Sequence, residues 1–193
     1  MNRSLRMRFI WWLIRIAMRR PYWALPGYME RYWLLGGSAR DDRPDEALGW
    51  KRGRLDAFIG RFIGIRVHKI LRSDLERHLH DHPGWFAAWI MIGSYTEVMP
   101  QRQGQSGLCD QFDCNLVRVR REQGAIYSHK ATDRHRLILD DHSHVWTLFI
   151  MGPKRNPWGF YTQLGKVYWR HYERFLQAES NEERRALVME AGK

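Results

Sequence analysis

Short apolar runs alternate with turn residues over most of the chain. From about residue 63 to residue 168, these runs are separated by Gly, Pro, Asp and Asn, which is typical of an all-β sandwich or barrel. The dipeptide Gly93-Ser94 between two of the runs is a two-residue hairpin signal. The predicted strands are Ile65–Leu71, Trp85–Ile92, Tyr95–Met99, Leu116–Arg121, Ala125–His129, His135–Leu139, Val145–Met151 and Trp158–Thr162.

The N-terminal segment has a helical period instead. Over residues 3–20, apolar positions are interrupted by Arg8, Arg15 and Arg19, which their spacing places on one helical stripe, and Pro21 ends the pattern. The segment is too short and too charged to span a bilayer, and it lacks a signal-peptide cleavage site. We expect either a helix on a membrane surface or nucleic acid, or a helix packed on the barrel with its arginines in solvent.

Helical character returns after Trp169, where Ser180 and Glu183 have the spacing of a capping box. The sequence therefore predicts a mainly β fold with N-terminal and C-terminal helices. The expected parts are a basic helix and connecting loop over residues 1–53, a barrel over residues 54–170 and a C-terminal helix over residues 171–193.

Composition narrows the function classes only moderately. The 193 residues are 44% apolar and 27% charged, which disfavours disorder of the whole chain. The net charge of +11 attracts phosphate polymers, anionic lipid or small anions, and it equally suits a basic surface without a partner. Two cysteines, Cys109 and Cys114, cannot form a disulfide framework, so we expect incidental loop thiols and a reducing cytoplasm.

The residues with the clearest chemistry are His80 and His82. Side chains two apart on a strand share a face, so both imidazoles can point into a barrel while Asp81 points away. Such a pair is suited to binding a metal, although clustered histidines also satisfy backbone carbonyls in polar turns. His78 has the same parity but lies further back, where we expect a supporting role at most.

These histidines resemble the motifs of the cupin superfamily. The first cupin motif reads Gly, five residues, His-x-His, three or four residues, Glu, six residues, Gly; the second reads Gly, five residues, Pro-x-Gly, two residues, His. His80 and His82 are followed by Gly93 at the distance of the first motif, and the stretch from Gly124 to His135 has the length of the second.

Over about residues 63–169 the chain looks like an uncharacterised cupin family of bacteria and their phages. The resemblance implies a double-stranded β-helix, or jelly-roll barrel, with one divalent metal ion bound near its axis by His80, His82 and His135. Iron is the first expectation, and manganese, nickel and zinc are alternatives. The longer signature that carries the resemblance also includes Gly93-Ser94-Tyr95-Thr96-Glu97, Trp146-Thr147-Leu148 and Gly152-Pro153-Lys154.

The chain also departs from the cupin motifs. Phe86 or Ala87 stands where the first motif has glutamate, so the fourth ligand is missing, and Lys130 and Thr132 replace the Pro and Gly of the second motif. Glu97 is the nearest carboxylate downstream. We expect Glu97 to line the pocket first and to be a ligand second, which makes it a catalytic candidate.

Three neutral imidazoles leave the charge of a metal uncompensated, which favours a small anionic substrate that chelates the ion. The absence of a His-x-Asp pair argues against a 2-oxoglutarate oxygenase. Arg118 and Arg120 alternate with valines on a predicted strand, so they are substrate-binding candidates if they point inward and solubilising residues if outward. Tyr127 has inward parity with His129 and is the second catalytic candidate. A further pair, His142-x-His144, is expected in solvent.

Two hypotheses about function follow. One is a mononuclear non-haem metal enzyme of the oxygenase type, because three-histidine cupin sites resemble those of known dioxygenases. The other is a non-catalytic cupin that binds a small ligand or partner and is docked weakly on nucleic acid or membrane by Arg8, Arg15 and Arg19. Edge pairing of its sheets into a homodimer is a further expectation.

Overall fold

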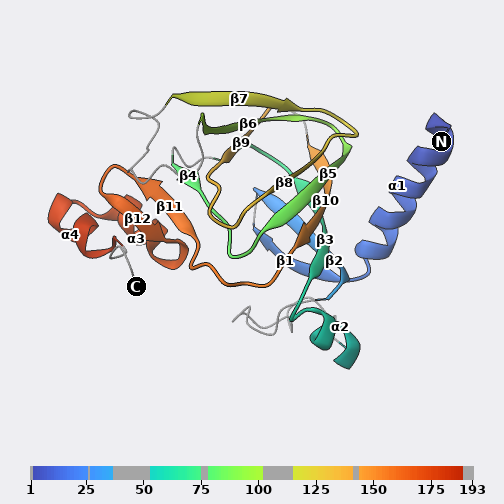
Figure 1. The fold of residues 1–193 in the computed structure, drawn as a ribbon, viewed down its shortest axis with the longest axis horizontal. Helices are drawn as coiled ribbons and strands as arrows, with labels where there is room; N and C mark the ends of the chain where they lie inside the picture. Colours follow the sequence, from blue (N-terminus) through green and yellow to red (C-terminus); the bar gives the residue numbers. More distant parts are fainter. Residues whose placement is uncertain are drawn as a thin grey trace.

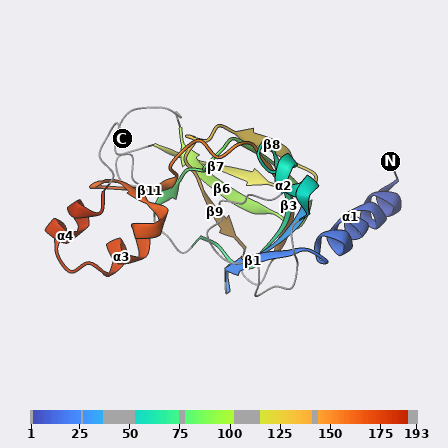
Figure 2. The same ribbon diagram turned by 90° about the horizontal axis from the view of Figure 1, so that it is seen from below.

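The structure is a computed structural model, and it describes residues 2–25, 27–36, 53–74, 78–101, 115–140 and 144–188. Figures 1 and 2 show a β-barrel with helices at its two ends. In chain order the elements are α1 (Arg3–Ala17), β1 (Pro21–Leu25), β2 (Met29–Leu35), α2 (Arg54–Ile59), β3 (Gly64–Ile70), β4 (Leu79–His80), β5 (Phe86–Ile92), β6 (Tyr95–Pro100), β7 (Leu116–Arg121), β8 (Ile126–His129), β9 (Arg136–Leu139), β10 (Val145–Met151), β11 (Gly159–Thr162), β12 (Gly165–Tyr168), the 3-10 turn η2 (Trp169–His171), α3 (Tyr172–Gln177) and α4 (Asn181–Ala186).

The strands form two facing antiparallel layers. One layer has the order β1-β2-β3-β10-β5-β8. The other combines β12-β11-β4 with β9-β6-β7, because His80 at the end of β4 and His135 just before β9 form an antiparallel bridge. Between β3 and β11 the chain passes repeatedly from one layer to the other, and only β6 and β7 are consecutive neighbours in the same layer. This strand order is that of a jelly roll, which confirms the predicted fold class.

The inner face of the first layer supplies much of the barrel core. Phe86, Ala88 and Ile90 alternate along β5, and each is at most 3% exposed. They lie opposite Met151, Phe149 and Thr147 of β10. This period of two is the pattern from which the strand was predicted.

Helix α1 covers part of the outer face of the same layer. Ile10, Ile14 and Ala17 have no exposed surface and join Val67 of β3 and Trp146 of β10 in one apolar cluster. The arginines at positions 8, 15 and 19 are exposed on the other side of the helix. The helix is therefore packed on the barrel with its arginine stripe in solvent. No helix among the described residues is long and apolar enough to cross a bilayer.

The hairpin of β1 and β2 was not predicted. It lies within the segment expected to hold only a helix and a loop, and β2 pairs with β3 from Met29 opposite Ile70 to Leu35 opposite Ile65. The barrel sheet therefore begins before residue 54. The segment from Met29 to Leu35 alternates poorly between apolar and polar residues, and its burial is intermediate at most positions, which explains why periodicity alone did not reveal it.

The C-terminal helices extend from the other end of the barrel, away from α1 (Figure 2). The predicted capping box is present, since the Ser180 side chain accepts a hydrogen bond from the backbone N–H of Glu183 and the Glu183 carboxylate accepts one from the backbone N–H of Ser180. Phe160 of β11 stacks on Tyr172 of α3 at 3.7 Å between ring centroids. This contact holds α3 beside β11, the strand that neighbours β4 and its histidine.

Candidate metal centre

Backbone pairing brings the three predicted histidines together. His80 donates its N–H to the carbonyl of His135 at 2.9 Å, and His135 donates to the carbonyl of His80 at 3.0 Å. His82 donates in turn to the carbonyl of Ala131 at 3.0 Å. The His-x-His stretch is thus held directly against the segment that precedes β9.

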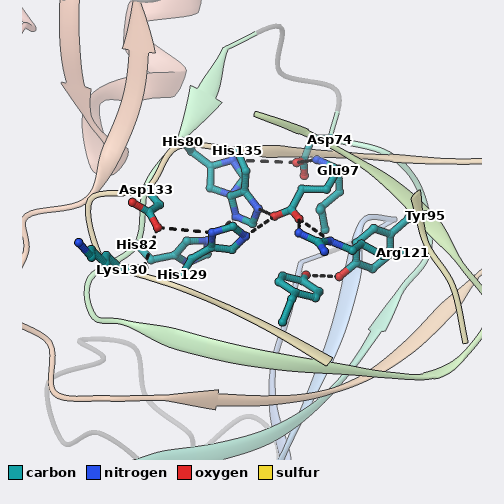
Figure 3. Close-up of polar contacts among 12 residues, drawn as sticks. Asp74, His80, His82, Tyr95, Glu97, Arg121, His129, Lys130, Asp133 and His135 are labelled. Atoms are coloured by element: carbon teal, nitrogen blue, oxygen red, sulfur yellow. Dashed lines mark hydrogen bonds and ion pairs between the residues drawn. The ribbon is translucent and has the colours of Figure 1, made fainter. Parts of the chain in front are cut away.

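The three imidazoles converge within the barrel. One ligand atom from each of His80, His82 and His135 can be chosen so that all three lie within 4.8 Å of one another. The Nε2 atoms of His82 and His135 are 2.7 Å apart, and the ring of His80 is centred 4.9 Å from that of His135. Figure 3 shows these rings side by side. Nitrogens at such separations can share one ion with metal–nitrogen bonds of about 2.0–2.1 Å.

Asp81, between the two histidines, points away from them as expected, but into the protein rather than into solvent. Its side chain has no exposed surface. It accepts hydrogen bonds from the backbone of Gly159, the hydroxyl of Tyr161 and the ammonium group of Lys166. These contacts tie the His-x-His stretch to β11 and β12 and so fix the direction of both imidazoles.

Glu97 of β6 lies behind His135 and not on the cavity wall. One carboxylate oxygen accepts from Nδ1 of His135 at 2.6 Å and from Nε2 of His129 at 2.8 Å, and the other accepts from Arg121 at 2.8 Å (Figure 3). An ionised carboxylate can only accept, so His135 must carry its proton on Nδ1. The lone pair on Nε2 of His135 is therefore available where the three rings meet.

A second buried carboxylate, Asp74, lies behind His80. It accepts from the backbone of Leu137 at 2.6 Å and from the hydroxyl of Tyr28, and it lies 4.0 Å from Nδ1 of His80. That nitrogen is buried without a hydrogen-bond partner among the described residues. A buried polar atom without a partner is costly, and the donor set of three imidazoles backed by two carboxylates is one that fits a divalent ion.

His80 and His82 are held in the neutral form that binds metals. Burial lowers the pKa of His80 to about 4, although the nearby Asp74 carboxylate opposes the shift. Burial, followed by the charges of His135 and His80, lowers the pKa of His82 well below its usual range. Both rings therefore present lone pairs at neutral pH.

A second group of potential ligands is formed by Glu97, His129 and His135. Its atoms already satisfy one another by hydrogen bonds, and the guanidinium of Arg121 lies beside the carboxylate. A divalent cation there would be repelled by Arg121. The three-histidine group is therefore the better candidate, with His129 in a supporting position that the sequence analysis missed. The shared parity of His129 and Tyr127 was the signal for it.

The histidines open onto a cavity of about 240 Å³ inside the barrel. Apolar and aromatic side chains make up most of its wall. The basic residues that line it are Arg31, Arg66 and Lys154. The described lining residues include no carboxylate, so the cavity suits an anion.

The remaining predicted site residues lie elsewhere or have other partners. Arg118 and Arg120 are exposed and do not line the cavity. Arg120 instead forms an ion pair with Asp140 at 2.6 Å. Tyr127 does line the cavity, but its hydroxyl is hydrogen bonded to that of Tyr95. His78 is hydrogen bonded to the hydroxyl of Tyr172 at 2.8 Å and is not part of the three-histidine group. His144 is exposed, whereas positions 109, 114 and 142 lie outside the described residues.

Comparisons with known proteins show similarity to cupin-fold structures. No protein-family model and no curated protein matches the chain. Among solved structures, the polyketide cyclase RemF from Streptomyces resistomycificus has a TM-score of 0.44 at 14% identity, over 85% of this chain and 88% of that one. Fe(II)-HppE has a TM-score of 0.42 at 9% identity, and the match covers 68% of this chain and 54% of that one. A Bacillus subtilis oxalate decarboxylase with Mn(II) centres has a TM-score of 0.46 at 11% identity, and the match covers 91% of this chain and 39% of that one. The cupin-like fold itself follows from the strand order, and these distant similarities carry no argument about substrate or reaction.

The depressed pKa of His80 predicts a pH-dependent stability for the metal-free protein. A histidine held neutral in the fold contributes its full stability above the unfolded pKa of about 6.5 and loses it as the pH falls towards the folded value of about 4. We expect the free energy of unfolding to fall by up to about 3 kcal/mol over this window. Urea denaturation at several pH values measures it. H80Q should flatten the curve, and an unchanged stability between pH 7 and pH 5 would contradict the prediction.

Replacement of the buried Glu97 should weaken both the fold and the site. E97Q keeps the shape but removes the charge that balances Arg121, and it no longer dictates which nitrogen of His135 is protonated. We expect a loss of about 2–3 kcal/mol in unfolding free energy and a loss of metal affinity of about 10–100-fold. Denaturation and competition with a chelator measure the two effects. The exposed Glu122 provides the control E122Q, which should change neither.

Proposed function

We propose that the chain is a metal-dependent enzyme of the oxygenase type, in which His80, His82 and His135 hold one divalent ion and the adjoining cavity binds a small anionic substrate. The observation that supports it is the convergence of three imidazoles at the wall of a basic cavity. Iron is the first candidate, and manganese, nickel and zinc remain alternatives. When bound, the ion supplies Lewis-acid or redox chemistry at its open positions.

The residues of the chain have separable tasks in this proposal. Glu97 orients His135 through Nδ1, and Asp81 fixes the backbone direction of the other two histidines. The apolar wall, which includes Phe86 and Phe149, excludes water and strengthens the electrostatic attraction for an anion. The Tyr95–Tyr127 hydroxyl pair lies in the same wall and is placed to donate one hydrogen bond to a bound substrate.

Metal analysis of the purified protein tests the ligand set. We expect about one equivalent of metal in the wild type and a loss of at least tenfold in affinity for H80A and H135A, because each removes one of three nitrogens. H144A changes an exposed histidine in the same way and is the matched control. Circular dichroism identifies a variant that fails to fold, and full occupancy of a folded H80A/H135A double variant would exclude the site.

Oxygen uptake tests the reaction class. Iron-loaded wild-type protein should consume dioxygen when a chelating carboxylate, enolate or thiolate substrate is supplied, and H80A should not. Stoichiometric metal binding without uptake over a broad panel of such anions would favour the non-catalytic ligand-binding function instead.

A second proposal concerns α1, and it is carried by the residues beside its arginine stripe. Trp11 and Trp12 are 45% and 55% exposed, and Phe9 stacks on Trp12 at 5.8 Å. Along the helix, Trp11 and Trp12 lie between the exposed Arg8 and Arg15, and these four residues line one shallow surface depression. No acidic residue precedes Glu30 in the sequence. We propose that this face binds an anionic membrane surface, since tryptophan prefers the lipid interface and arginine pairs with phosphate.

Vesicle sedimentation tests whether the exposed face of α1 binds an anionic membrane rather than nucleic acid or a second copy of the chain. The full chain should bind phosphatidylcholine vesicles that contain phosphatidylserine more tightly than vesicles without it. The R8Q/R15Q variant should bind about 30-fold more weakly, at about 1 kcal/mol per arginine. W12A should also weaken binding, whereas L176A, at a 54% exposed position of α3, should not. Binding to duplex DNA but not to vesicles, or self-association abolished by W12A, would overturn the proposal.

A further inference from the structure

The inner face of β2, β3 and β10 carries a polar group that the proposed metal site does not use. Arg31 of β2 is paired with His68 of β3, and His68 is paired on its other side with Thr147 of β10. Arg66 lies two residues before His68, so the two share a face. All four of these residues line the cavity.

Burial and packing hold the guanidinium of Arg66 in place. The residue is only 5% exposed, and its guanidinium carbon lies 4.7 Å from the ring centre of Trp33 and 5.6 Å from that of Phe149. A guanidinium fixed between two aromatic faces is preorganised for a planar anion, because little side-chain entropy is lost when the anion binds.

His68 provides the feature that points to a ligand. It is 7% exposed and lines the cavity, and its Nε2 atom is buried without a hydrogen-bond partner among the described residues. The ring is fixed by stacking on Phe149 at 4.7 Å. A buried ring nitrogen without a partner destabilises the fold, and a bound ligand atom that hydrogen bonds with it removes this cost.

This group faces the three histidines from the opposite layer. Phe149 contacts both sides, with its ring centre 4.7 Å from that of His68 and 6.1 Å from that of His82. The charge of Arg66 also contributes, after burial, to the lowered pKa values of both His68 and His82. One short molecule can therefore contact both layers at once.

We propose that Arg31, Arg66 and His68 form a carboxylate-binding subsite, so that the substrate is a short molecule with a metal-chelating group at one end and a carboxylate at the other. The metal-chelating end rests on the proposed function, whereas the carboxylate-binding subsite does not. Arg66 forms the ion pair, His68 donates a hydrogen bond from Nε2, and Arg31 adds charge at the rim. This assigns to the first layer the anion clamp for which Arg118 and Arg120 were candidates only if they pointed inward.

Calorimetry with simple carboxylates tests the subsite. Glutarate carries two carboxylates and butyrate carries one, and both are titrated into zinc-loaded and metal-free protein. The loaded wild type should bind glutarate at least about tenfold more tightly than butyrate, since a second charged hydrogen-bonded contact is made. R66M and H68F should remove this preference without changing zinc content. R118M, which removes an exposed arginine of β7, is the matched control and should keep it.

The outcomes of these titrations distinguish a failure of the proposed metal site from a failure of the carboxylate-binding subsite. Metal-free protein that binds butyrate in an Arg66-dependent manner, but fails to bind zinc, would overturn the metal site and support the subsite. Zinc binding with equal affinity for glutarate and butyrate, or a preference that survives in R66M, would overturn the subsite alone. R66K keeps the charge without the planar fork, so it guards against a folding defect and should retain only part of the preference.

Discussion

The reciprocal backbone bonds between His80 and His135 are the constraint on which the site depends. They join β4 to β9 and so complete the second layer of the barrel. The same two residues supply two of the three converging imidazoles. Closure of the fold and assembly of the candidate metal centre are therefore one event, and a chain that did not pair here would lack both.

Much of the barrel was predictable because its strands alternate regularly. The predicted runs over residues 116–121 and 145–151 coincide with β7 and β10, and the other predicted runs differ from the observed strands by one residue at one or both ends. The hairpin of β1 and β2 was not found, because its burial is intermediate along most of β2 and depends on pairing with β3. Tertiary pairing of this kind leaves little periodicity in the sequence.

The candidate ligands were predictable from motif spacing, but their surroundings were not. Glu97 was expected on the cavity wall and lies behind His135, because the register of β6 with β9 pairs it with Leu137, two residues after that histidine. Asp74 gave no signal of its own and His129 gave only its shared parity with Tyr127, since the partners of both come from segments remote in sequence. The expectation that nothing balances the charge of a metal is also corrected: Asp74 and Glu97 place two buried carboxylates directly behind the histidines.

The two layers of the barrel thus differ in electrostatic character. The layer that holds the histidines has its carboxylates behind them, where they stabilise a cation, whereas the facing layer presents Arg66 and His68 to the same cavity. An anion entering this space is attracted from both sides once a cation is bound, and in a water-poor cavity each attraction is stronger than it is at the surface. With a cation bound as proposed, the arrangement would therefore discriminate among ligands by where their negative charges lie along a short axis, which shape alone could not do in a largely apolar cavity.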